Sequence, residues 1–405
     1  MTHARRGANL FAAPTAHGKI IVTDHSPTQT EALLARLVAF DVTSADSNLG
    51  LIDWVEHYLR SLGFAVHLVP DEGGQKAGLY ASIGPRRPGG VLLSAHSDVV
   101  PVEGQTWTRP PFELGRDGTR LYGRGTTDMK GFLACVLAAA DVASRANLSE
   151  PFKIALSYDE EVGCLGIARM IGQLEATIGL PRLVIVGEPT QMQVAVGHKG
   201  KVAWRMTAKG QAGHSSLAPR YRNALFPMAE FLLALHEEQA VLAKGGVRDP
   251  DYDIPHSTLH PGVVRGGRVL NVVPEEATVD FELRYLPGDD PAGIEARIAA
   301  RAAAIAARAS DERALRIERT IAYPGFAIAA DDPVVAEVQA WAGGTATTRV
   351  GFGTEAGFFA GMGVPVVVCG PGAIGQAHTA DEYIEAAELA ACDAMLARLV
   401  QSLAG

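Results

Sequence analysis

The chain has 405 residues, and its 36 Lys+Arg and 45 Asp+Glu residues leave a formal net charge of −9 at pH 7. That balance argues against a protein whose partner is nucleic acid or an anionic membrane, because both require a cationic surface. Hydrophobic residues make up 47% and charged residues 20% of the chain, which excludes global disorder. The length predicts about two to three domains.

The N-terminal 27 residues contain charged residues, glycine and proline but no apolar core of a signal peptide. We therefore expect residues 1–27 to be a loosely ordered extension and the chain to be cytoplasmic. The sequence has no run of about 18 apolar residues, so no membrane span is predicted. The four cysteines are far apart and form no CxxC pair, which predicts reduced, mostly buried thiols rather than disulfides or a thiolate zinc site.

Short apolar runs alternate with helical patterns over residues 28–193 and again over residues 316–405. Helices are predicted from about residue 28, and at 48–62, 132–142, 167–174, 335–341 and 384–403. Strands are predicted at 64–69, 78–83, 91–95, 154–157, 183–186 and 365–368. This alternation predicts an α/β domain with a mixed sheet flanked by helices on both faces.

The pattern changes between these two stretches. Longer strands with alternating apolar residues are predicted at 194–208 and 268–286, and helices at 224–240 and 294–307. The order strand-helix-strand-strand-helix-strand is typical of a small ferredoxin-like α+β module. We expect residues 194–315 to form such a module, inserted in the larger domain.

Four segments carry acidic or imidazole side chains directly after an apolar strand or at the start of a helix. In open α/β sheets, ligands bind in the crevice beyond the carboxyl ends of the strands, so these side chains should meet there. Each motif alone is common in surface turns, but four in one domain predict a site where a cation offsets crowded carboxylates. The residues are His96 and Asp98, Asp128, the pair Glu160 and Glu161, and Glu188.

Histidine nitrogen and carboxylate oxygen suit zinc, cobalt or manganese. His378 follows a loop rich in glycine and proline and would add one more ligand. Two histidines and three carboxylates are too many for one tetrahedral zinc, and they fit two ions about 3.5–4 Å apart that share a carboxylate. Residues i and i+2 of an extended chain point the same way, so Asp98 can hold the ring of His96. In the pair Glu160 and Glu161 one side chain can bind metal while the other acts as general base, and spacing leaves open which.

Competing motifs are weaker. Residues 123–128 begin like a dinucleotide-binding loop but have aspartate in place of the third glycine, and residues 351–356 fit GxGxxA without a strand-to-helix context. Neither GxSxG nor a P-loop occurs. A non-enzymatic binding protein that has lost catalysis is a further alternative, and the intact set of acids argues against it.

These residues resemble the motifs of the dinuclear zinc amidohydrolases and exopeptidases related to acetylornithine deacetylase, succinyl-diaminopimelate desuccinylase, aminoacylases and glutamate carboxypeptidases. The resemblance spans about residues 30–403 and is carried by residues 94–101, 123–131, 159–163 and 187–190. It implies a hydrolase that acts on the amide bond of a small N-acyl amino acid, with two divalent ions per subunit, zinc or cobalt.

The resemblance also implies roles for the predicted site residues. Asp98 would orient His96, and Glu160 would be the catalytic base. The metals would be held by His96 and Glu188 on one side, Glu161 and His378 on the other, and Asp128 between them.

The inserted module resembles the lid and dimerisation domain of these enzymes, which implies a homodimer. His214, within Gly-His-Ser-Ser, matches the histidine that reaches the partner subunit's active site and stabilises the oxyanion. Asn271 and Arg284 match positions that hold the carboxylate end of the substrate, for which an arginine fork is well suited.

Within the family, residues 158–166, 196–200, 286–290 and 351–357 resemble acetylornithine deacetylase. This implies N2-acetylornithine as the substrate, and so a step of arginine biosynthesis. It also places Lys199, Thr354 and Glu355 in the substrate site, where Glu355 would meet the cationic ornithine group. Desuccinylases instead have Gly-Thr-Ser-Asp near Thr354. Another N-acyl amino acid such as succinyl-diaminopimelate, a formylated amine or a dipeptide is the alternative substrate.

Overall fold

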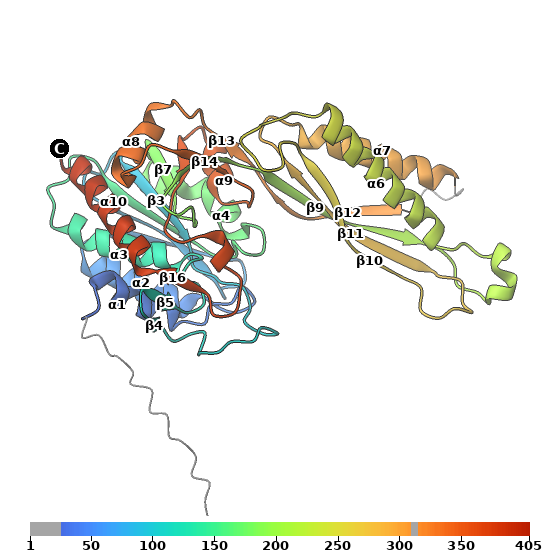
Figure 1. The fold of residues 1–405 in the computed structure, drawn as a ribbon, viewed down its shortest axis with the longest axis horizontal. Helices are drawn as coiled ribbons and strands as arrows, with labels where there is room; N and C mark the ends of the chain where they lie inside the picture. Colours follow the sequence, from blue (N-terminus) through green and yellow to red (C-terminus); the bar gives the residue numbers. More distant parts are fainter. Residues whose placement is uncertain (1–25, 309–314) are drawn as a thin grey trace, which may run out of the picture.

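Two bodies make up the part of the chain that the computed structural model describes, residues 26–308 and 315–405. A broad α/β domain carries both ends of this part, and a long module projects from one side of it (Figure 1). The expected extension at residues 1–27 lies almost entirely outside the described residues. None of the described helices is both long and apolar enough to cross a bilayer. All four cysteines are buried and unpaired.

A nine-stranded mixed sheet forms the centre of the α/β domain within the described residues. The order of its strands is β1-β2-β6-β3-β7-β15-β8-β13, and β14 pairs with β8. β3 is parallel to β6 and β7, and β7 to β15, whereas β1 and β2 form an antiparallel edge. The strands span Ala65–Pro70 (β1), Ala77–Ile83 (β2), Val91–His96 (β3), Phe152–Ser157 (β6), Leu183–Val186 (β7), Val194–His198 (β8), Phe326–Ala327 (β13), Thr347–Val350 (β14) and Val366–Val368 (β15).

Helices cover both faces of this sheet, so the expected fold class is confirmed. Successive strand residues such as Leu92 and Leu93 belong to different core clusters, because side chains alternate between the two faces of a strand. One cluster includes α1 (Gln29–Val38), α2 (Leu49–Ser61), α3 (Lys130–Ser144), α8 (Pro333–Ala342) and α10 (Ala386–Ala404). The other includes α4 (Leu165–Met170), α5 (Leu174–Ile178) and α9 (Ala356–Gly361).

Local signals explain where the first helices begin and end. Thr28 Oγ1 accepts a hydrogen bond from the Glu31 amide, and the Glu31 carboxylate accepts one from the Thr28 amide. This capping box satisfies two amides that an α-helix leaves unpaired at its start. α2 ends before Gly63, whose φ of 87° lies in the left-handed region that favours glycine.

A small three-stranded sheet, separate from the large one, joins two segments that are far apart in sequence. β5 (Arg120–Tyr122) pairs with β4 (Gly115–Asp117) and with β16 (Tyr383–Glu385), which leads into α10. In the β5–β16 pair Tyr122 lies opposite Tyr383. The loop that follows β5 therefore starts beside the segment that precedes β16, and both segments carry predicted metal ligands.

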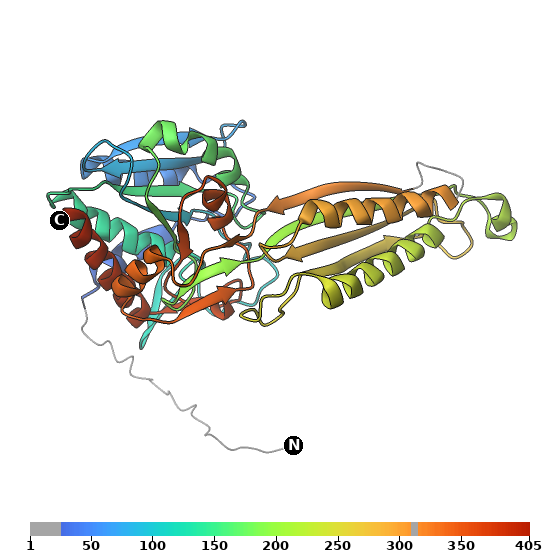
Figure 2. The same cartoon turned by 90° about the horizontal axis from the view of Figure 1, so that it is seen from above.

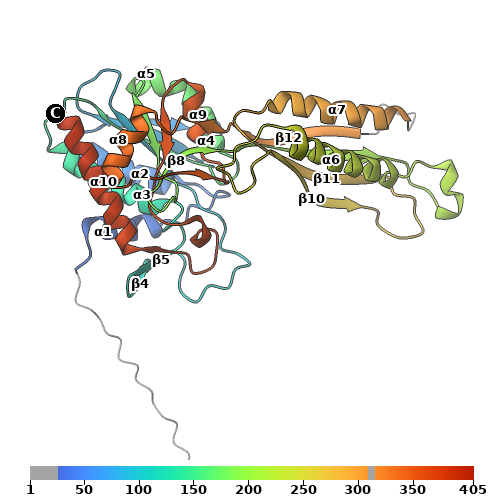
Figure 3. The same cartoon turned by 45° about the horizontal axis from the view of Figure 1, so that its top comes forward.

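The projecting module is a four-stranded antiparallel sheet with two helices packed on one face (Figure 2). Its strand order is β10-β11-β9-β12, and the two helices lie side by side along it (Figure 3). Alternate residues of β9 and β11 are buried, as the predicted pattern requires. The elements are β9 (Gly200–Lys209), α6 (Leu225–Gly245), β10 (Thr258–Gly266), β11 (Glu276–Tyr285), α7 (Pro291–Arg308) and β12 (Leu315–Tyr323).

Three boundaries differ from the sequence-based expectation. The sequence placed the module at residues 194–315, but residues 194–198 (β8) belong to the large sheet and the module's sheet runs from Gly200 to Tyr323. The strand expected at 268–286 begins only at Glu276, because residues 268–275 form bends and a turn and include Pro274, which lacks a backbone N–H for strand pairing. The predicted order contained a strand at the place of β10, but no residues were assigned to it, since seven of its nine residues are exposed and it lacks alternation.

Candidate metal centre

Three parallel strands bring the predicted acids to one edge of the large sheet. In the register of the sheet, His96 of β3 lies opposite Ser157 of β6, and Ser94 lies opposite Val186 of β7. The three strands therefore end together, and the residues that follow them gather beyond their carboxyl ends. Asp98 follows β3, Glu160 and Glu161 follow β6, and Glu188 follows β7.

Asp128 lies between two histidines from distant parts of the chain. It precedes α3. Its Oδ1 is 3.0 Å from Nε2 of His96, and its Oδ2 is 3.2 Å from Nε2 of His378. Each carboxylate oxygen thus faces a different imidazole, an arrangement that suits a carboxylate shared between two ions.

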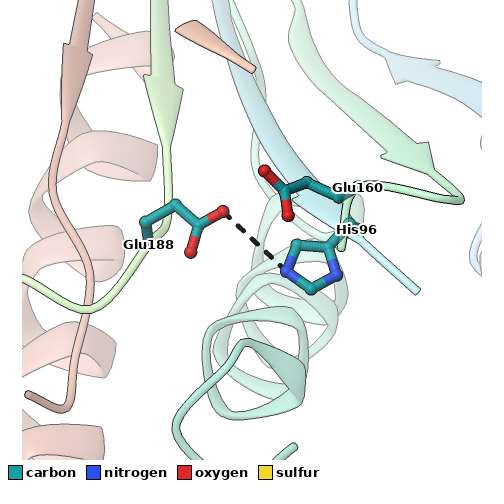
Figure 4. A group of neighbouring side chains, drawn as sticks. All are labelled: His96, Glu160 and Glu188. Carbon is teal, nitrogen blue, oxygen red and sulfur yellow. Dashed lines mark ion pairs between the residues drawn. The ribbon is translucent and has the colours of Figure 1, made fainter. Parts of the chain in front are cut away.

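The remaining predicted ligands divide between the two histidines. Glu161 Oε2 is 3.0 Å from His378 Nε2, and Glu188 Oε1 is 3.8 Å from His96 Nε2. Figure 4 shows the carboxylate of Glu188 directed at the ring of His96, with Glu160 beside that ring. One ligand atom each from His96, Glu160 and Glu188 lies within 4.8 Å of the others, so Glu160 is close enough to act on a group bound there.

Asp98 contacts His96, as expected, and also makes contacts that were not predicted. The Nδ1 atom of His96 lies 3.0 Å from the backbone oxygen of Asp98 and 3.5 Å from its carboxylate. The same carboxylate accepts hydrogen bonds from the backbone amides of Glu160 (3.1 Å) and Glu161 (3.3 Å) and from the Ser44 hydroxyl (2.7 Å). Asp98 therefore fixes the acidic pair as well as the histidine, which the motif alone did not predict.

The charges of the cluster favour a bound cation. Burial raises the pKa of Glu160 and of Glu188 well above the usual range, and the carboxylate of Asp128 raises both further. Burial and Asp128 also raise the pKa of Glu161 to about 7. Hydrogen bonds to Asp128 and Glu161 raise the pKa of His378 to about 10. Crowded, buried carboxylates of this kind are stabilised by bound cations, and nitrogen and oxygen donors together suit zinc or a similar ion.

A cavity of about 200 Å³ opens beside the cluster at the junction with the module. Besides the cluster residues, its lining includes Lys201, Arg284 and Tyr323. Glu282 holds both cations: its carboxylate is 2.9 Å from Arg284 Nε and 2.8 Å from Lys201 Nζ. Lys201 was missed because only the pairing of β9 with β11 places it opposite Arg284. The cavity thus has a cationic wall facing an acidic one.

Comparison with known proteins agrees with this geometry. Residues 92–402 match the family described as peptidase family M20/M25/M40. The chain belongs to this family. Acetylornithine deacetylases from Myxococcus xanthus and Proteus mirabilis are 35% and 32% identical to it, over 92% and 90% of this chain and 97% and 92% of the relatives. This M20 member is accordingly a metal-binding hydrolase that acts on amide bonds.

Solved structures show the same fold at low identity. An M20 family metallo-carboxypeptidase from Sulfolobus solfataricus is 19% identical, with a TM-score of 0.78 over 93% of this chain and 99% of that chain. The YXEP protein of Bacillus subtilis, a dinuclear metal-binding peptidase from the M20 family, is 15% identical, with a TM-score of 0.66 over 92% of this chain and 97% of that chain.

Three residues expected at the substrate site of this M20 member do not line the cavity. Glu355 is 1% exposed, and its carboxylate accepts hydrogen bonds from the hydroxyls of Ser94 and Ser157 behind the strand ends. Thr354 is fully buried, and its hydroxyl oxygen accepts a hydrogen bond from the Ala356 amide at the start of α9. Lys199 donates to the backbone oxygens of residues 254 and 256 instead of facing the metal ligands. Glu355 therefore does not line the cavity beside the metal ligands, where the sequence placed it for contact with a cationic substrate group.

Two other expected residues lie at the far end of the module. His214 and Asn271 are exposed, and the Ser215 amide donates to the Asn271 backbone oxygen at 3.0 Å. This end, with the short helix Ser215–Arg220, is the part of the module farthest from the α/β domain (Figure 1). Nδ1 of His214 accepts from the Ser216 amide at 3.2 Å, which leaves Nε2 free to donate in the neutral ring. Neither residue lines the cavity of its own chain.

Proposed function

We propose that this protein hydrolyses N2-acetylornithine to ornithine and acetate with two zinc ions. The observation that carries the proposal is the placement of Asp128 between His96 and His378, with one carboxylate oxygen toward each ring. The substrate is supported by relatives named acetylornithine deacetylase at up to 35% identity across nearly the whole chain. Cobalt suits the same donors.

We assign His96 and Glu188 to one ion, Glu161 and His378 to the other, and Asp128 to both. The bound ions would polarise the amide carbonyl and lower the pKa of the attacking water. Glu160, beside His96 and Glu188, accepts the proton of that water and then delivers it to the departing amine. Burial raises the pKa of the Glu160 carboxyl above its usual range, which favours uptake of a proton. Cys164 Sγ lies 3.2 Å from Glu160 Oε1 and helps to hold it in place.

The cationic wall of the cavity would hold the carboxylate of the amino acid. Arg284 lines this wall, with its Nε bound to Glu282 and its NH1 3.2 Å from the Tyr323 hydroxyl. These contacts fix the guanidinium and leave part of its fork for a ligand carboxylate. Lys201 adds a second positive charge at the same wall.

We propose that the enzyme is a homodimer in which His214 enters the site of the other subunit and donates to the developing oxyanion. Its position at the far end of the module supports this, because its own cavity is at the opposite end. The outer surface of the module offers an interface: β10 is an edge strand, and α6 has exposed apolar side chains that recur along it. These side chains are Phe226 (71% exposed), Leu233 (63%) and Val241 (49%).

One observation favours a second candidate substrate. The acid expected to meet the ornithine side chain, Glu355, is buried, whereas the cavity presents two cations. An N-acyl amino acid with a second carboxylate, such as succinyl-diaminopimelate, would match that wall better by charge.

The unpaired cysteines suit a reducing compartment, and we place the reaction in the cytoplasm.

A substrate panel tests both candidates. Purified protein would be assayed with N2-acetylornithine, succinyl-diaminopimelate, other N-acetyl amino acids and dipeptides, before and after chelation and with zinc or cobalt restored. We expect chelation to abolish activity and metal to restore it, with the highest kcat/KM for N2-acetylornithine. A preference for the dicarboxylate would select the second candidate. Absence of metal-dependent hydrolysis across the panel would refute the proposal.

A further inference from the structure

A buried carboxylate outside the proposed ligand set, Glu382, organises the loop that presents Asp128. Glu382 is 1% exposed. Its Oε1 accepts hydrogen bonds from the backbone amides of Thr127 (2.9 Å) and Asp128 (3.2 Å). Its Oε2 accepts from the Gly125 amide (2.9 Å) and from the Arg124 guanidinium (2.8 Å), which is itself 1% exposed. One side chain thus collects four donors from five consecutive residues that end at Asp128.

The same network holds the segment that carries His378. Glu382 lies four residues after His378 and leads into β16, which pairs with β5. Arg124 donates to the Thr379 backbone oxygen (3.3 Å) and to the side-chain oxygen of Gln105 (2.5 Å). Gln105 in turn donates to the backbone oxygen of His378 (2.8 Å). The loops of Asp128 and His378, about 250 residues apart in sequence, are therefore tied to one another by hydrogen bonds that are buried around Glu382 and become exposed toward His378.

Only a carboxylate satisfies all four donors. Each of its oxygens faces N–H groups, so it must accept on both sides. A glutamine in the same place has one oxygen and one NH2 group. In either orientation the NH2 group would face N–H donors, leaving a backbone amide or the arginine without an acceptor in a buried site, which is costly.

We propose that Glu382 is a positioning residue that fixes Asp128 relative to His378 and thereby sets the affinity for the ion these two share with Glu161. The proposal rests on the ligand assignment under "Proposed function". Residues behind metal ligands commonly change metal affinity about 10- to 100-fold when replaced, because they orient the ligands before the ion binds. The ion assigned to His96 and Glu188 should depend less on Glu382, since of its three ligands only Asp128 belongs to the network, whereas both Asp128 and His378 of the other ion do.

The test is zinc binding by metal-free full-length protein, measured by calorimetry and by metal content after dialysis. For Glu382→Gln we expect one of the two zinc ions to bind about 10- to 100-fold more weakly. Excess zinc should then restore kcat while KM stays near the wild-type value. The matched control is Glu238→Gln, which breaks another buried carboxylate–arginine pair, that of Glu238 and Arg297 in the module. It should lower the melting temperature and leave both zinc affinities unchanged.

If the Glu382→Gln variant folds and binds both zinc ions with wild-type affinity, the proposal is wrong. If that variant does not fold, Gln105→Ala removes the milder link to His378 and should weaken the same ion by a smaller factor. No change in zinc binding there would also count against it. Since zinc binding is measured without substrate, the result is separate from the choice of substrate. Wild-type protein that binds no zinc would instead refute the proposed function itself.

Discussion

The metal centre and the far end of the inserted module were both predicted from motifs of a few residues, but they differ in what completes them. At the centre, side chains from five separate segments meet within one chain, and only His378 among them is exposed. At the far end, His214 and Asn271 are exposed and do not line the cavity of their own chain.

The difference follows from the cost of burying charge. Buried carboxylates and imidazoles are tolerated only when partners surround them, so the fold must assemble the whole centre internally. An exposed histidine needs no such partners and can remain in water until a second molecule covers it. A motif on a buried strand end therefore predicts its surroundings, whereas a motif on an exposed loop does not.

The largest expected effect tests the centre. Glu160→Gln keeps the size of the side chain but removes the base, so kcat for N2-acetylornithine should fall by about 10²- to 10⁴-fold. Zinc content and KM should stay close to the wild-type values. Glu175→Gln, at an exposed acid on α5, serves as the control and should be active. Near-wild-type turnover by Glu160→Gln would remove its assignment as base.

The next effect tests whether the module's far end belongs to another subunit's centre. His214→Ala should lower kcat by about 10²- to 10³-fold, as expected for loss of an oxyanion donor, while His57→Ala on α2 should not. Mixing and refolding His214→Ala with Glu160→Gln should return activity, because a mixed dimer contains one intact site. A mixture as inactive as its components would mean that His214 does not act in trans.

The third prediction concerns the point where the chain passes from the α/β domain into the module. His198, the last residue of β8, lies there. Its ring is fully buried, and burial lowers its pKa to about 4. Below the ordinary pKa of 6.5 His198 takes up a proton in the unfolded chain, whereas in the folded protein it stays neutral down to about pH 4. The free energy of unfolding should therefore be undiminished above pH 6.5 and fall as the pH drops toward 4, by roughly 3 kcal/mol from this group.

This pH dependence is measured by urea unfolding across that range, with His198→Phe as the comparison. The variant keeps an aromatic ring against Phe326, whose centroid is 4.9 Å from that of His198. In this variant the fall in the free energy of unfolding that His198 contributes between pH 6.5 and 4 should be absent. Identical slopes in both proteins would show that His198 is not held neutral by the fold.

The smallest expected effect tests the wall contributed by the module. Arg284→Lys keeps the charge but loses the planar fork, so KM should rise roughly 10-fold with little change in kcat. The control is Arg205→Lys on the same sheet, where the arginine pairs with Asp280 and does not line the cavity. A fall in kcat at unchanged KM would place Arg284 with the reacting atoms instead of the carboxylate end.

Local sequence signals predicted most of both bodies. Apolar runs and their flanking acids predicted β3, β6 and β7 with the residues at their ends, and the alternation in β9 and β11 predicted the core face of the module. The residues of the edge strand β10 were not identified, because exposure on both sides removes the alternation on which such a prediction depends.

The sequence by itself determined the residue types of the centre and their place at strand ends, because periodicity and turns are local properties. Only the tertiary structure decided which side chains meet. It buried Glu355 behind Ser94 and Ser157, put Lys201 opposite Arg284, and tied the Asp128 loop to Glu382. Each of these contacts joins residues from about 80 to 260 positions apart, and their pairing depends on strand register and packing, which no short motif contains.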